Sequence, residues 1–121
     1  MKLKKITTFE VDDKIAESII KLNNKGFETA MCCSGHTDEE EIVPYVMFTK
    51  FVSYGIEYIP FGWVVDKRFK ELVIRRFFDD EEKEIFTKEQ LIDIAARELD
   101  SWADTLPIFK NPYQTMRTEV I

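Results

Sequence analysis

The sequence predicts an α+β domain in which two helices pack on one face of a mostly antiparallel sheet. Two segments show helical periodicity with well-marked ends, and short runs rich in β-forming residues precede and separate them. Their order is β-α-β-β-β-β-α, and a ferredoxin-like split βαβ is one version of this arrangement. The 121 residues suffice for a single domain, 1–121, with one core.

The first helix has clear boundaries in the sequence. A strand is expected over 3–9, after which Asp12 can cap the helix. A stripe of apolar residues at helical spacing runs from there to Leu22. Gly26 suits the left-handed position beyond the helix end, where Phe27 can fold back on Leu22 as in a Schellman ending.

Four runs of β-forming residues are expected to build most of the sheet. The first should place on one face the side chains of Phe27, Thr29, Met31 and Cys33. The second is apolar on both faces, which predicts a central position. The last two are expected to pair with each other across a turn. In chain order the four runs are 27–33, 42–51, 63–65 and 72–78.

The second helix is also well marked. Thr87 and Gln90 form the pattern of a capping box, and Pro107 stops the helix. The acidic run 79–82 that precedes it is predicted to be a solvated turn. The tail over 112–121 is expected to add an edge strand or to wrap around the domain.

Composition limits the classes of partner. The formal net charge is −6 and the isoelectric point is near 4.9. Because binding to phosphate backbones draws on Lys and Arg, this charge disfavours nucleic acid as the partner. Nothing resembles a signal peptide, and no apolar run approaches the roughly 20 residues that span a bilayer. We therefore expect a cytoplasmic protein without a membrane partner, in a compartment where thiols stay reduced.

One short segment carries the strongest functional signal. It consists of Cys32, Cys33, Ser34, Gly35 and His36, and it holds both cysteines and the only histidine of the chain. An acidic run, 38–41, follows almost at once. Sulfur, imidazole and carboxylate groups are thus gathered at one predicted turn. We expect residues 32–36 to form a functional loop that contacts a ligand.

Three interpretations of this loop stay open. Zinc prefers thiolate and imidazole ligands, so Cys33 (or Cys32) and His36, with a downstream carboxylate, could hold a divalent metal such as zinc. Alternatively, Cys33 could be a catalytic nucleophile with His36 as its base, although the nearby carboxylates work against a thiolate. In the third interpretation Cys33 is a small buried side chain, Cys32 faces a helix, and His36 hydrogen-bonds the turn.

The run from Leu22 to His36 resembles a segment of small proteins from Firmicutes and their phages. In those proteins, to which no function is attached, a helix ending in Leu-Asn-x-x-Gly precedes a strand ending in Cys-Cys-Ser-Gly-His. The run is also distantly similar to the Ser-Cys-Ser-Gly-Arg segment of the wybutosine-synthesis tRNA methyltransferase family, whose activity implies an RNA substrate and a methyl donor. This chain is much shorter and has His36 where that family has Arg, so no catalytic role is transferred.

A second group of residues combines positive charge with aromatic rings. Its members are Lys67, Arg68, Lys70, Arg75 and Arg76, interleaved with Trp63, Phe69, Phe77 and Phe78. Such a hairpin could stack bases and contact phosphates. On a strand, however, Arg75 and Arg76 point to opposite faces, each beside a phenylalanine, so charged and apolar surfaces are not separated. We interpret the group as an ordinary strand pair.

These observations favour a small cytosolic binding or regulatory domain whose loop 32–36 contacts a small ligand or a protein. One alternative is a metal- or thiol-dependent enzyme that uses Cys33 and His36. Another is a structural partner protein that forms a homo-oligomer through an exposed aromatic patch.

Overall fold

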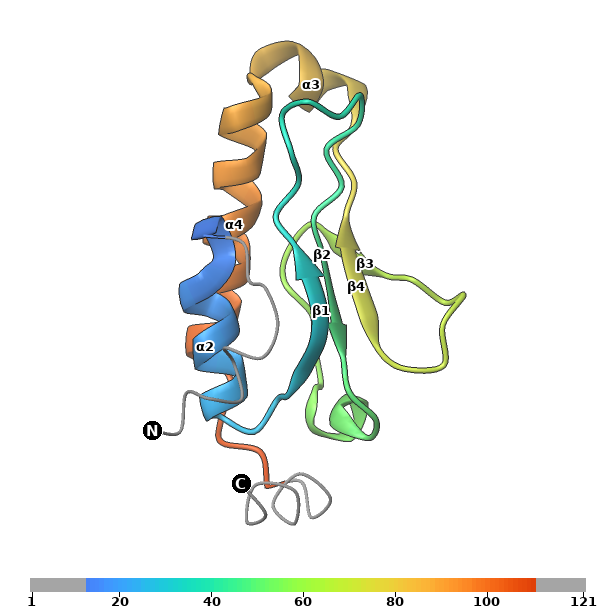
Figure 1. Ribbon diagram of the computed structural model, residues 1–121, viewed down its shortest axis with the longest axis vertical. Helices are drawn as coiled ribbons and strands as arrows, with labels where there is room; N and C mark the ends of the chain where they lie inside the picture. The colour runs from blue at the N-terminus through green and yellow to red at the C-terminus, as the bar shows by residue number, and fades with distance from the viewer. Residues whose placement is uncertain (1–12, 111–121) are drawn as a thin grey trace.

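The computed structural model describes residues 13–110, which form two layers, one of helices and one of strands (Figure 1). The strands make one antiparallel sheet in the order β1-β2-β4-β3. They are β1 (Thr29–Cys33), β2 (Tyr45–Phe48), β3 (Trp63–Val65) and β4 (Val73–Arg76). The helical segments are η1 (Asp13–Ile15), α2 (Ala16–Asn24), η2 (Val52–Gly55), α3 (Asp80–Ile85) and α4 (Lys88–Thr105). The predicted α+β class is therefore confirmed.

Helices α2 and α4 lie side by side and cover one face of the sheet (Figure 1). Their inward side chains, such as Leu22 and Leu99, join those of the central strands, such as Val46 and Ile74, in one buried core. Val73 is also buried but is not part of this core, because it points to the opposite face. Among residues 13–110, no helix covers that opposite face, which we call the open face (Figure 1).

The end of α2 has the predicted Schellman geometry. The backbone N–H of Phe27 donates to the carbonyl of Leu22 at 2.8 Å, and that of Gly26 donates to Asn23 at 3.1 Å. Gly26 has φ +99°, the left-handed conformation that this ending needs. Phe27 and Leu22 are both buried in the core, so the turn also directs the chain into β1.

The predicted face of β1 is wrong, because the strand contains a bulge. Thr29 lies opposite Phe48 and Met31 lies opposite Met47, so Ala30 is an extra residue in the ladder. The insertion reverses the alternation of side chains. Thr29 is only 3% exposed, whereas Met31 is 54% exposed. Phe27 and Thr29 therefore belong to the buried side, and Met31 belongs to the open face.

Strand β2 is central, as predicted, since it pairs with both β1 and β4. It is shorter than the predicted 42–51, because Pro44 precedes it and Phe51 has a left-handed φ of 74°. A strand cannot continue through that conformation, and the chain instead enters the turn η2. The last predicted strand, 72–78, is likewise reduced to β4.

The acidic run 79–82 is a helix start rather than the predicted turn. The carboxylate of Asp79 accepts from the backbone N–H of Glu82 at 2.8 Å, and the Glu82 side chain accepts from the N–H of Asp79 at 2.9 Å. This is a capping box, and acidic side chains favour the positive end of a helix dipole. The equivalent box predicted for Thr87 and Gln90 at the start of α4 is confirmed.

Three predictions fall outside the described residues: the strand over 3–9, the cap at Asp12 and the tail over 112–121. The first of these is the strand that a ferredoxin-like split βαβ would require. None of the helices found between residues 13 and 110 has the length and apolar character needed to cross a lipid bilayer.

Candidate functional site

The loop that leaves β1 places Cys33 beside His36. The Sγ atom of Cys33 lies 3.6 Å from Nε2 of His36, and the backbone N–H of Gly35 donates to the same sulfur at 3.3 Å. The imidazole is exposed and the thiol is half-buried. A sulfur atom and an imidazole nitrogen thus meet at an accessible edge of the sheet.

Packing against α4 holds this loop in place. Gly35 is buried with φ +93°, and a β-carbon at this position would lie 2.8 Å from Ile42 and 3.6 Å from Ile92. Only glycine fits this combination of left-handed backbone and close approach. Ser34 is buried as well. The middle of the loop is therefore an anchor, and its two ends carry Cys33 and His36.

The two cysteines point to opposite sides of the sheet. Cys32 lies opposite Val46 and packs against the core, whereas Cys33 lies opposite Tyr45 in the next row. Both residues are thiols rather than a disulfide. Strand alternation accounts for this separation, because adjacent residues of a strand point to opposite faces. Of the two sulfurs, that of Cys33 therefore forms the site with His36.

Cys33 begins a row of polar side chains across the open face. It lies opposite Tyr45 on β2, which lies opposite Arg75 on β4. The guanidinium carbon of Arg75 is 4.9 Å from the centre of the Tyr45 ring. Burial raises the pKa of Tyr45, and the neighbouring sulfur of Cys33 adds to the rise, while Arg75 opposes it. The phenol therefore stays protonated and can donate a hydrogen bond.

Asp66 fixes the far end of this row. Its carboxylate accepts from Arg75 Nε at 2.6 Å and from Arg68 Nη2 at 2.6 Å. The two guanidinium groups, that of Arg68 first, hold the pKa of Asp66 well below its usual range. Both also lie near the ring of Phe69. Two positive charges share one carboxylate, so this part of the open face is locally positive.

Tyr45 and Asp66 belong to this row, but the sequence did not predict them as site residues. Each lies at the end of a strand, and neither belongs to a sequence motif. Strand alternation alone does not predict that Tyr45 lies beside Cys33, because that prediction also requires the register in which the two strands pair. Arg76, which the sequence analysis grouped with Arg75, faces the other way and is buried against α3 and α4.

The acidic run 38–41 does not complete a metal site. Within residues 13–110, no group of three or more His, Cys, Asp or Glu side chains is arranged to hold a metal ion. Glu41 instead pairs with Lys83 at 3.0 Å. The Nζ atom of Lys88 donates to the backbone carbonyls of Thr37 and Glu39. The carboxylate that the zinc interpretation required from this run is therefore not brought to Cys33 and His36.

Comparison with known proteins assigns no relative. No family model matches the chain, and no curated protein or solved structure matches it significantly. The resemblances noted for the run from Leu22 to His36 stay predictions.

Proposed function

We propose that this chain is a small binding domain that holds an anionic ligand on the open face of its sheet, at the edge marked by Cys33 and His36. The observation that carries the proposal is the 3.6 Å approach of the Cys33 sulfur to the His36 imidazole at an accessible position. Because the proposed site needs a reduced thiol, we infer a cytoplasmic location.

The chemistry of the row favours an anion. A thiol, an imidazole, a phenol and a guanidinium can each donate a hydrogen bond. Cys33, Tyr45 and Arg75 lie in one cross-strand row, and His36 stands at its end. The pair of arginines around Asp66 adds positive charge. A small molecule with a carboxylate or phosphate group would match these donors.

A thermal-shift titration with inorganic phosphate and a set of small carboxylates tests the proposal. We expect at least one of these probes to stabilise the chain, and the variant His36→Ala to lose that stabilisation. Thr37→Ala is the matched control, since Thr37 is an exposed neighbour in the same loop. An anion that stabilises the parent and His36→Ala equally would contradict the proposed site, and so would the absence of any stabilising probe.

A thiol-dependent enzyme is the second candidate, and the bond from the Gly35 N–H to the Cys33 sulfur favours it. A backbone donor and a protonated imidazole both stabilise a thiolate. Alkylation by iodoacetamide at pH 7, followed by mass spectrometry, should modify Cys33 faster than Cys32, and His36→Ala should slow the reaction at Cys33. Equal rates at the two sulfurs in the parent chain would remove this candidate.

A further inference from the structure

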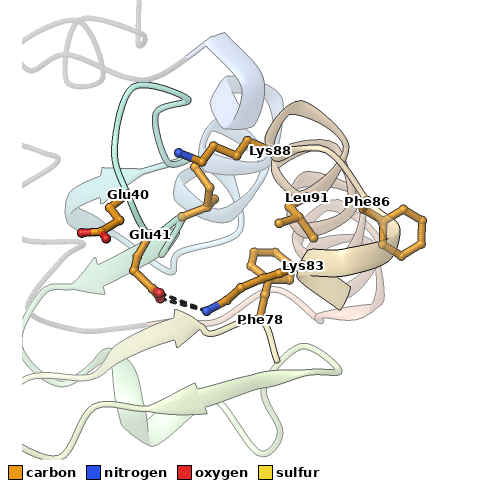
Figure 2. Close-up of a pocket in the computed structure, with 8 residues that line it drawn as sticks. Glu40, Glu41, Phe78, Lys83, Phe86, Lys88 and Leu91 are labelled. Carbon is orange, nitrogen blue, oxygen red and sulfur yellow. Dashed lines mark hydrogen bonds and ion pairs between the residues drawn. The ribbon is translucent and has the colours of Figure 1, made fainter. Parts of the chain in front are cut away.

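A cavity of about 230 Å³ lies between the loop that precedes β2 and the helices α3 and α4 (Figure 2). Its buried lining is apolar and consists of Ile42, Phe78 and Leu91. Cys33 and His36 are not among the residues that line it. The cavity is therefore separate from the site proposed above, although the same loop bounds both.

The two lysines at the rim of the cavity are already engaged. Figure 2 shows Lys83 of α3 and Glu41 of the loop reaching toward each other, and their Nζ and Oε2 atoms are 3.0 Å apart. Glu41 is the main cause that raises the pKa of Lys83. Lys88 donates to backbone carbonyls of the loop, at Thr37 and Glu39. Both ammonium groups thus hold the rim together, and the charge of Lys83 is compensated by Glu41.

Acidic side chains dominate the surroundings of the cavity. The run 38–41 contains four acids and no base. The segment 79–89 contains six acids against two lysines, and the charged residues that line the cavity itself are Glu40 and Glu41 with Lys83 and Lys88. The four acids of 38–41 and the excess of four acids in 79–89 together exceed the net charge of the whole chain, which is −6. The negative charge of the chain is therefore concentrated in these two segments. A partner of opposite charge is favoured at this end of the molecule.

The size of the cavity indicates what enters it. Sites for small molecules and cofactors usually measure about 300–1,000 Å³, and this cavity is smaller. Its dimensions suit one apolar side chain, in the manner of the buried anchor residues of protein interfaces. We propose that the cavity is a docking site for a basic peptide segment of a partner protein, which inserts one apolar side chain between flanking lysines or arginines.

Fluorescence anisotropy with labelled model peptides tests this docking site on the full chain. The probe is Lys-Lys-Leu-Lys-Lys, and the comparison peptides are Lys-Lys-Ser-Lys-Lys and Glu-Glu-Leu-Glu-Glu. We expect the first to bind, with an affinity that falls as salt is added. The serine peptide should bind at least about tenfold more weakly, because it cannot bury an apolar side chain. The acidic peptide should not bind.

Reversing one charge at the rim provides the matched test. Glu40→Lys should weaken binding of the leucine peptide by about threefold to tenfold. Glu57→Lys makes the same change of net charge at another exposed position and should leave binding unaltered. Equal binding of the leucine and serine peptides, equal losses in the two variants, or no binding at all would overturn the proposal.

Sedimentation of the full chain without peptide tests whether a second copy of this chain, rather than a partner protein, occupies the cavity. A monomer is expected over the concentrations used for the peptide titrations. A concentration-dependent dimer that Glu40→Lys abolishes would mean that a second copy of this chain fills the cavity, which would overturn the assignment to a partner protein.

Discussion

The guanidinium of Arg76 and the carboxylate of Glu98 form a two-point contact that ties the last strand to the long helix. Arg76 Nε lies 2.9 Å from Oε1 of Glu98, and Nη2 lies 3.1 Å from Oε2. Burial by itself would lower the pKa of Arg76, but the bonds to Glu98 and Glu82 outweigh it and raise the pKa. The indole of Trp63 also donates to Glu98, at 3.1 Å. This carboxylate therefore joins β3 and β4 to α4.

Replacing Glu98 by alanine should lower the free energy of unfolding by about 3 kcal/mol, because it leaves a buried guanidinium and an indole N–H without this acceptor. Urea denaturation of the purified variant measures the loss. Glu57→Ala, an exposed position, is the control and should change stability by less than about 0.5 kcal/mol. Equal stability of Glu98→Ala and the parent would show that the contact contributes nothing.

Gly26→Ala should destabilise the protein by at least about 2 kcal/mol. A left-handed conformation at alanine costs about 1–2 kcal/mol, and the added β-carbon would lie 1.9 Å from the carbonyl oxygen of Phe109. Thermal and urea unfolding both report the change. Asn24→Ala, at an exposed position of the same helix, should be neutral or slightly stabilising. A Gly26→Ala variant as stable as the parent would argue against this packing.

The cap of α4 can be tested by itself. Thr87→Ala removes the acceptor of the Gln90 N–H and should cost about 1 kcal/mol of stability, whereas Thr87→Ser keeps a hydroxyl and should lose much less. The measurement is the urea midpoint of the three proteins. If serine proved as damaging as alanine, the methyl group rather than the hydrogen bond would be responsible.

Stability should fall as the pH drops below about 4, and Asp66 is one cause. Its pKa in the folded chain is held below the unfolded value of about 3.9 by Arg68 and Arg75. In that window the unfolded state binds the proton first, so the stabilisation present above pH 4 is lost as the pH falls.

Asp66→Asn should therefore be less stable than the parent at pH 7 and should lose less of its stability between pH 4 and pH 2. Urea midpoints measured across this range give the change of stability with pH for the parent and for Asp66→Asn. Lys67→Gln alters a neighbouring exposed charge and should follow the slope of the parent. An equal loss of stability between pH 4 and pH 2 in the parent and in Asp66→Asn would contradict the role of this carboxylate in acid unfolding.

Local signals in the sequence determined the end of α2, the start of α4 and the class of fold. The Schellman ending at Gly26 and the capping box at Thr87 depend on residues three to five positions apart, so neighbouring residues alone specify them. The capping box at Asp79 has the same local signature, but the acidic run equally suits a solvated turn, so the helix start there was not predicted. The approach of Cys33 to His36 is local as well, since one glycine-containing turn separates them.

Only the tertiary structure decided which side chains share a surface. The bulge at Ala30 reverses the faces of β1, and it arises from the pairing with β2 rather than from any local pattern. The same pairing sets Tyr45 beside Cys33, and the next pairing sets Arg75 beside Tyr45. Arg75 and Arg76 are neighbours in the chain, yet one lies on the open face and the other is buried against Glu98. Contacts between segments far apart in the sequence depend on register and packing, which no short run of residues encodes.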